Sequence, residues 1–268
     1  MHCDFETYST IDLPSVGAFR YAEEPSTEAL CVSFSNGNGV PEIVNLQKEG
    51  MRSLKLRPLF DAVARGERLV AHNSHFERAI WEKVCSKHGW PVPKAAQWKC
   101  TAAKASAAAY PRSLQNVAIA LKLNVNKDPK GLALIRKFCK PDKKGVRTTW
   151  RDQPEEFEAL LRYCQQDTIV ERAVDEALPD LIPSEERVFR LDYIINNRGI
   201  PIDVELAKRT LEISNELALA LQEEALAMTG LKATQRDKLL DWLEAAGAGM
   251  DTLQAQEVEA VKIGRAHV

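Results

Sequence analysis

The chain has 268 residues, of which 45% are hydrophobic and 28% are charged, the balance of an ordinary globular protein. No apolar run reaches the length of a membrane span, and no basic-then-apolar signal peptide opens the chain. The six cysteines form no C-x-x-C pair and no zinc-finger spacing with histidine, which indicates reduced thiols and a cytoplasmic location.

In chain order, the first hundred residues alternate between short strands and helices. We expect strands at 1–8, 29–34, 41–46 and 68–71, and helices at 54–65 and 74–88. The turn at 36–39 joins the second and third strands into a hairpin. Interleaved helices and strands of this kind predict an α/β fold with a mixed β-sheet flanked by helices.

The rest of the chain is predicted to be almost entirely helical. The expected helices are 101–109, 113–121, 131–139, 154–178, 184–196, 204–228 and 235–246. After residue 183 the strand patterns disappear, so we place a domain boundary there. The prediction is an α/β domain at 1–182 and an all-helical segment at 183–268.

Positive charge is concentrated in one block. Residues 94–151 contain 14 lysines and arginines but only two acidic residues, Asp128 and Asp142. The block therefore carries +12, and because the whole chain carries −2, the remainder carries −14. Such a division is typical of a protein that holds phosphates with one part and metal ions with another. A solvated basic surface is the alternative, and the charge count alone does not separate the two.

Two acidic residues open the first expected strand. Side chains alternate between the faces of a strand, so Asp4 and Glu6 point one way and Phe5 points into a core. Two like charges on one face repel, and a divalent cation between them is the usual compensation. Taken alone, the pair also fits a solvated strand end with two surface acids.

A second polar group follows the strand at 68–71. Asn73 lies at the junction with the next helix, and Glu77 lies in its first turn, where the helix dipole favours a carboxylate with or without a metal. His72 and His75 have no third soft ligand nearby, which argues against zinc.

A third group lies on the expected helix 154–178. Tyr163 and Asp167 are four residues apart and therefore share one helical face. By itself this pair also fits the exposed surface of a charged helix. The order of the three groups is a more specific signal of function than any one group alone. The chain has D-x-E on a first strand, N-x-x-F-E at a helix start, and Y-x-x-x-D on a later helix.

This order resembles the three motifs of the DEDDy exonucleases, proofreading 3′→5′ enzymes with a ribonuclease H-like fold. The stretches 4–7, 16–21, 25–28, 71–73, 76–81 and 162–164 look like the phage-type branch of family A DNA polymerases. The similarity is strong up to about residue 182. It continues through 191–192, 198–203 and 239–243, where that family leads into its polymerase domain.

The resemblance implies metal-dependent hydrolysis of DNA 3′ termini to nucleoside monophosphates, with two divalent ions, Mg²⁺ or Mn²⁺. In that family's roles, Asp4, Glu6 and Asp167 hold one ion, and Asp4 bridges to a second that Glu77 supports. Tyr163 orients the attacking water. The broader pattern has aspartate where this chain has Glu77. No motif for nucleotidyl transfer appears, so we expect no DNA synthesis by this chain.

Further residues are expected to contact the substrate, which is a single-stranded DNA 3′ end. Thr7 is expected to contact the terminal nucleotide, and Asn73 and Phe76 its sugar and base, although a core position is an open alternative for Phe76. Three residues of the basic block are expected to reach phosphates: Lys127, Lys130 and Arg136. A polymerase domain is expected in cis in the full-length protein.

Two other functions fit the same motifs. One is a ribonuclease D-like RNA 3′ exonuclease, and the other is an inactive DNA-binding or structural fragment that keeps the fold. Both termini also raise a question. Residues 263–268 are encoded by a string that resembles a sequencing adapter, so our hypothesis is that the natural protein is longer. Only three residues precede Asp4, which indicates a clipped start as well.

Overall fold

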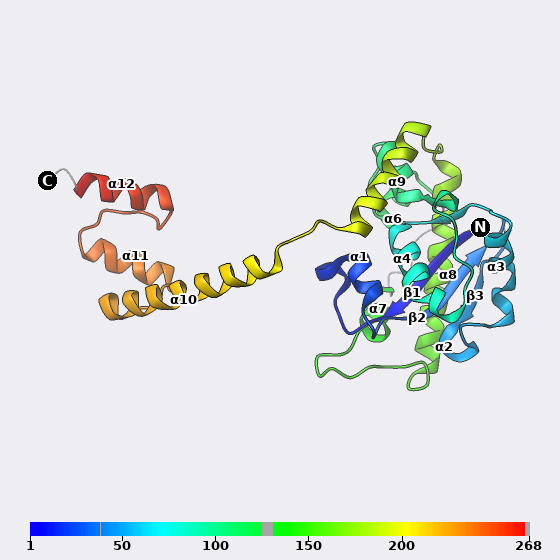
Figure 1. The fold of residues 1–268 in the computed structure, drawn as a ribbon, viewed down its shortest axis with the longest axis horizontal. Helices are drawn as coiled ribbons and strands as arrows, with labels where there is room; N and C mark the ends of the chain where they lie inside the picture. The colour runs from blue at the N-terminus through cyan, green and yellow to red at the C-terminus, as the bar shows by residue number, and fades with distance from the viewer. Residues whose placement is uncertain (38, 125–130, 266–268) are drawn as a thin grey trace. The chain divides into compact units, whose positions relative to one another are not determined.

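The structure of the chain, a computed structural model, describes residues 1–37, 39–124 and 131–265 (Figure 1). Within these residues a five-stranded mixed sheet has the order β3-β2-β1-β4-β5. The strands are β1 (His2–Tyr8), β2 (Glu28–Ser35), β3 (Glu42–Asn45), β4 (Leu69–Ala71) and β5 (Trp98–Cys100). β1 is central, antiparallel to β2 and parallel to β4. The mixed sheet confirms the predicted α/β class and is consistent with a ribonuclease H-like fold.

The alternation of β1 divides its side chains between two environments. Phe5 is 3% exposed and packs against the rings of Trp81 and Trp90, each at 6.0 Å between centroids. The side chains of Asp4 and Glu6 point to the opposite face of the strand. Between Glu6 and Thr7 the register with β2 shifts, a bulge that turns the strand beside an acidic residue.

Helices cover the sheet. In the first part of the chain they are α1 (Leu13–Glu23), α2 (Leu46–Glu49), α3 (Arg57–Ala64), α4 (His75–Lys83), α5 (Thr101–Ala107), α6 (Leu114–Ala120), α7 (Gly131–Phe138), α8 (Pro154–Ala177) and α9 (Pro183–Arg198). Of these, α8 is the longest and packs against β1 and β2. Its first turn contains Pro154, Glu155 and Glu156, which suit a helix N-terminus.

Several predicted elements agree with the structure, and others were wrong. The strand at 1–8, the hairpin and the long helix at 154–178 are confirmed. The prediction that 98–140 is mostly helical did not include β5, and α1 and α2 were also missed. The helix expected at 74–88 ends at Lys83, and a 3₁₀ turn (Cys85–His88) completes it.

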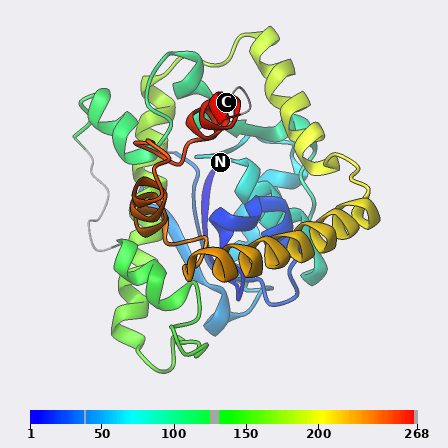
Figure 2. The ribbon, with the colours of Figure 1, turned by 90° about the vertical axis from the view of Figure 1, so that its left-hand side faces the viewer.

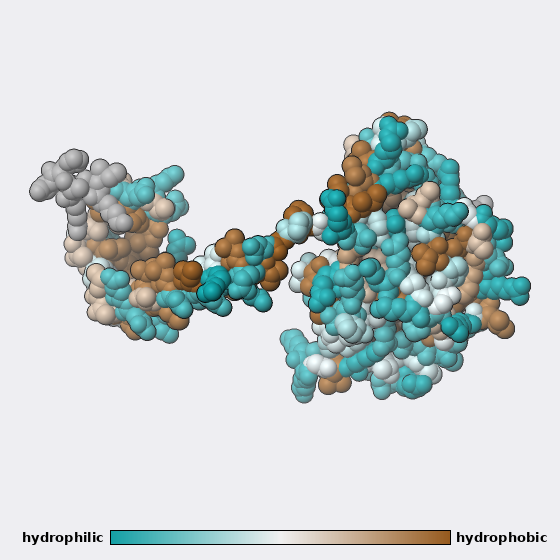
Figure 3. All heavy atoms as spheres, viewed as in Figure 1, coloured by the Kyte–Doolittle hydropathy of each residue, from teal (hydrophilic) through white to brown (hydrophobic). Residues whose placement is uncertain are grey.

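Contacts along the chain define two compact units, Met1–Gly199 and Ile200–Val268. The second unit contains α10 (Val204–Thr229), α11 (Arg236–Ala245) and α12 (Ala255–Arg265), drawn from yellow to red in Figure 2. None of the 26 residues described for α10 is buried, and Figure 3 shows hydrophobic side chains on its surface. Among the described residues, no helix is long and apolar enough to cross a membrane. The functional boundary at 182/183 stays a prediction.

Candidate metal centre

Three carboxylates that are far apart in the sequence meet on one side of the sheet. Asp4 and Glu6 come from β1 and Asp167 from α8, and a ligand oxygen from each lies within 4.8 Å of the others. Glu6 is 9% exposed, Asp167 is 6% exposed and Asp4 is half-buried. In the described part of the chain this is the one group of three or more such residues that could hold a metal ion.

The donor set fits a hard divalent cation. All three donors are carboxylates, whose oxygens Mg²⁺ and Mn²⁺ prefer. Oxygens bound to one Mg²⁺ at about 2.1 Å lie at most about 4.2 Å apart, so small side-chain rotations bring the observed group onto one ion. Without a cation or a proton, three carboxylates at this spacing repel one another.

Glu77 lies close to this group but is not one of the three. It occupies the first turn of α4 and is 3% exposed. Burial raises the pKa of its carboxyl well above the ordinary value, and the nearby Asp4 carboxylate raises it further. No described residue forms a hydrogen bond with its Oε2 atom. A buried carboxyl with one unsatisfied oxygen beside Asp4 fits the expected support of a second ion.

Tyr163 lies one turn before Asp167 on α8 and is 4% exposed. Burial raises the pKa of its phenol above the ordinary value of 10, and the Asp167 carboxylate, to which it is hydrogen-bonded, raises it further. The Tyr163 side chain is therefore a neutral hydroxyl near pH 7. Its ring lies against the backbone of Gly131 at the start of α7: a Cβ added there would lie 2.0 Å from Tyr163 Cε2.

A thiol lies beside Glu6. The Cys139 Sγ donates to Glu6 Oε2 at 3.6 Å, and the Cys139 carbonyl accepts a hydrogen bond from the backbone N–H of Ser9 at 3.2 Å. Burial raises the pKa of the Cys139 thiol well above its ordinary range, and the Glu6 carboxylate adds to this effect. Cys139 is therefore a neutral donor to Glu6.

The expected substrate residues lie in different settings. The Thr7 hydroxyl is buried and pairs with the Tyr21 hydroxyl at 2.9 Å. Phe76 is half-buried and packs against the core, with its ring 6.1 Å from that of Tyr21. Asn73 is exposed, has a left-handed backbone (φ 69°) and accepts a hydrogen bond from Arg112 Nη2 at 3.1 Å.

The basic block is divided between internal and exposed positions. Lys104 lies 2.7 Å from Asp175, and Arg147 lies 2.8 Å from Glu28, so both form ion pairs within the fold. Arg136 is exposed on α7, and no described residue forms an ion pair with it. Lys127 and Lys130 lie outside the described residues. The block is therefore in part structural, and only its exposed members are free to meet a polyanion.

The sequence analysis missed Arg112, which lies beside Asn73, and Glu171, which lies near Asp4 and Glu77. Arg112 bonds to Asn73 through its side chain and accepts from His72 Nε2 through its carbonyl at 2.8 Å. Glu171, one turn beyond Asp167, is 1% exposed. Its spacing from Tyr163 and Asp167 (i, i+4, i+8) is a signal that was available, but it is shared by many charged helices.

The order of the strands is consistent with a ribonuclease H-like α/β fold. No protein-family model matches the chain. The DNA polymerase of Bacillus phage SP02 is 34% identical to it over 265 residues, which cover 96% of this chain and 40% of that polymerase. This similarity confirms the resemblance to phage DNA polymerases that the motifs indicated.

Proposed function

We propose that this chain is a metal-dependent 3′→5′ exonuclease that hydrolyses DNA 3′ termini to nucleoside monophosphates, the proofreading part of a DNA polymerase. The observation that carries the proposal is the convergence of Asp4, Glu6 and Asp167 within 4.8 Å. At least 160 residues separate Asp167 from the other two, so the fold itself brings the three together. The similarity to a phage DNA polymerase supports DNA as the substrate.

Each side chain has a distinct task in this proposal. Asp4, Glu6 and Asp167 would hold one divalent ion, and Asp4 and Glu77 would hold a second. Bound Mg²⁺ or Mn²⁺ supplies charge neutralisation at the scissile phosphate and lowers the pKa of a coordinated water. The apolar packing of Phe5 on one face of β1 keeps Asp4 and Glu6 on the other face.

Tyr163 orients the attacking water and does not act as its base. Its hydroxyl hydrogen is held by Asp167, and its raised pKa keeps the proton on Oη at neutral pH. A group that holds its proton so firmly is suited to positioning.

The substrate strand would approach from the side of the exposed polar residues. Arg112 and Asn73 form a hydrogen-bonded pair at the C-terminal end of β4, and Arg136 offers an exposed guanidinium on α7. Guanidinium groups are well suited to phosphate oxygens. We infer that a polymerase part acts in cis in the full-length protein, since the similarity covers 40% of the phage polymerase. The cytoplasmic location indicated by the cysteines stays a prediction.

A comparison of DNA and RNA tests the proposal against its nearest alternative. Matched single-stranded oligonucleotides labelled at the 3′ end are incubated with the chain in Mg²⁺ or Mn²⁺. We expect release of labelled nucleoside monophosphate from DNA, and none in EDTA. Faster release from RNA would favour the ribonuclease D-like function instead. A folded chain that degrades neither substrate would favour the inactive DNA-binding or structural fragment.

A further inference from the structure

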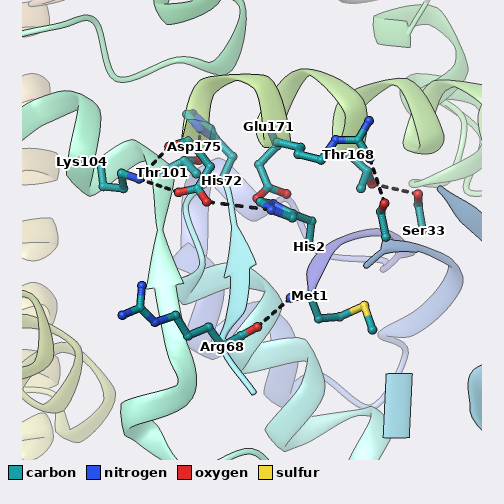
Figure 4. Close-up of polar contacts among 12 residues, drawn as sticks. Met1, His2, Ser33, Arg68, His72, Thr101, Lys104, Thr168, Glu171 and Asp175 are labelled. Atoms are coloured by element: carbon teal, nitrogen blue, oxygen red, sulfur yellow. Dashed lines mark hydrogen bonds and ion pairs between the residues drawn. The ribbon is translucent and has the colours of Figure 1, made fainter. Parts of the chain in front are cut away.

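A buried pair joins the start of β1 to α8. Glu171 Oε1 lies 2.9 Å from His2 Nδ1, and the side chains of Glu171 and His2 are 2% and 14% exposed (Figure 4). His2 is the first residue of β1 and stands two positions before Asp4, on the same face of the strand. Glu171 follows Asp167 by one helical turn. The pair therefore connects the two elements that carry the candidate metal ligands.

The pair belongs to a row of contacts along one face of α8. Cys164 Sγ donates to the carbonyl oxygen of Asp4 at 3.5 Å, and Thr168 Oγ1 donates to Ser33 Oγ at 2.8 Å. Ser33 is the residue of β2 directly opposite Asp4. Positions 164, 168 and 171 follow one helical face, and one turn further Asp175 Oδ2 lies 3.9 Å from His2 Nε2. The helix α8 therefore contacts β1 at both Asp4 and His2.

Backbone pairing also holds this end of β1, since His2 and Cys3 lie opposite Ser35 and Phe34 of β2. The Met1 amine donates to the Arg68 carbonyl at 2.9 Å, and the N–H of Val70 donates to the Met1 carbonyl at 2.9 Å. His2 opposite Val70 is the one register pair described between β1 and β4. These backbone contacts fix the strand within the sheet. Among the side-chain contacts to α8 at this end, the His2–Glu171 pair is the shortest.

The surroundings of Glu171 do not suit a purely structural role. No described residue forms a hydrogen bond with its Oε2 atom, and the Asp4 and Glu77 carboxyls raise its pKa in addition to burial. A protein with a buried acid in such a place is often less stable than one with a well-packed apolar side chain there. Buried polar groups that lower the stability of the fold are expected mainly at functional sites.

We propose that His2 and Glu171 are positioning residues that hold β1 against α8 so that Asp4 and Asp167 face the same metal ion. They touch neither the ion nor the substrate, and they act through the spacing of the ligands. This inference rests on the proposed function, because it assumes that the carboxylate group binds a divalent cation.

The test measures Mn²⁺ affinity by calorimetry or electron paramagnetic resonance, with metal-free thermal unfolding recorded for each variant. Glu171→Leu removes the hydrogen bond and retains a buried side chain of similar size. We expect Mn²⁺ affinity to fall about 10-fold to 100-fold, as for other residues that orient metal ligands, without a fall in metal-free melting temperature. Glu171→Gln keeps an acceptor for His2 and should remain within about 3-fold of the wild type.

Controls separate this inference from the proposed function. Glu176→Gln changes an exposed residue of the same helix and should leave Mn²⁺ affinity unchanged. Asp4→Asn should abolish tight binding. If Asp4→Asn binds Mn²⁺ like the wild type, the proposed metal site and the positioning role are both wrong. If Asp4→Asn loses binding while Glu171→Leu keeps wild-type affinity, only the positioning role is wrong.

If Glu171→Leu does not fold, a second variant tests the same contact. His2→Val places a strand-favouring residue at a partly exposed position and removes the same contact from the other side. Its Mn²⁺ affinity should fall as for Glu171→Leu. Wild-type affinity in His2→Val would overturn the proposal, as would an equal loss in Glu171→Gln and Glu171→Leu, since the glutamine retains the contact.

Discussion

At the scale of single residues, the candidate site depends on carboxyl groups held in unfavourable surroundings. Glu77 and Glu171 are almost fully buried, and burial raises the pKa of both. Each has an oxygen that no described residue bonds. Such groups are tolerated when a cation completes their environment, so this region should be more stable with metal than without it.

The metal-free protein should lose stability as pH rises. The folded-state pKa values of Glu77 and Glu171 lie above the unfolded value near 4.5, so the native state retains protons that the unfolded state releases. Their contribution is fully present below pH 4.5 and is lost as pH rises through the folded values. We expect the melting temperature in EDTA to fall from pH 5 towards neutrality, and Mg²⁺ to restore it. A flat profile in EDTA would contradict the assigned shifts.

Glu77→Gln should separate stability from metal binding. Removing the buried ionisable carboxyl should raise the metal-free melting temperature at pH 7 by several degrees, since about 1 kcal/mol shifts it by roughly 2–4 °C in a domain of this size. Exonuclease activity should fall on the order of 100-fold or more. Glu77→Ala should abolish it. Wild-type degradation of single-stranded DNA by Glu77→Ala would remove Glu77 from the site.

Tyr163→Phe should slow catalysis and leave metal binding intact. The change removes the hydroxyl that bonds to Asp167 and, in the proposal, orients water. One hydrogen bond to a charged group corresponds to about a 10-fold to 100-fold fall in kcat. Mn²⁺ affinity should stay within about 3-fold. Because the pKa of Tyr163 is above 10, the wild-type rate should show no loss from tyrosine ionisation between pH 7 and 9. Such a loss would contradict the raised pKa.

At the scale of elements, the approach of α7 to α8 constrains Tyr163. A Cβ on Gly131 would lie 2.0 Å from the Tyr163 ring, so Gly131→Ala should displace that ring, reduce exonuclease activity and lower the melting temperature. Gly39→Ala is the matched control, because no atom lies within 4 Å of its added Cβ. Equal activity in the two variants would show that α7 does not determine the position of Tyr163.

The elements also show what the sequence could and could not predict. β1, the hairpin and α8 have clear periodicity, and their motifs were sufficient to place Asp4, Glu6 and Asp167 together. β5 was missed because its three residues are too short to show alternation and lead directly into α5. α1 was missed because a break at Gly17, where φ is 75°, interrupts the helix. Glu171 was missed because burial of a helix face depends on tertiary packing, which spacing alone does not give.

At the scale of the whole molecule, the hydrophobic clusters of the described residues lie within 1–178. α9 still belongs to the first compact unit, since Tyr193 is 2% exposed, donates to Glu82 at 2.7 Å and packs against Phe19. The unit Met1–Gly199 therefore contains every described residue of the proposed site.

Two truncations test where the functional domain ends. The chain 1–199 should keep the melting temperature and Mn²⁺ affinity of the first unit. The chain 1–182 lacks Tyr193 and should unfold several degrees lower, because removing a buried aromatic side chain costs about 3–5 kcal/mol. Equal stability of the two truncations would favour the boundary at 182/183.

The central claim is that Asp4, Glu6 and Asp167 form a metal site that hydrolyses DNA from its 3′ end. The most direct measurement is the rate at which 3′-labelled single-stranded DNA releases nucleoside monophosphate, in Mg²⁺ and in EDTA. Wild type, Asp4→Asn and the exposed control Glu176→Gln are compared. We expect metal-dependent release by the wild type and the control, and a loss on the order of 100-fold or more in Asp4→Asn. Equal release by Asp4→Asn, or release that persists in EDTA, would contradict the claim.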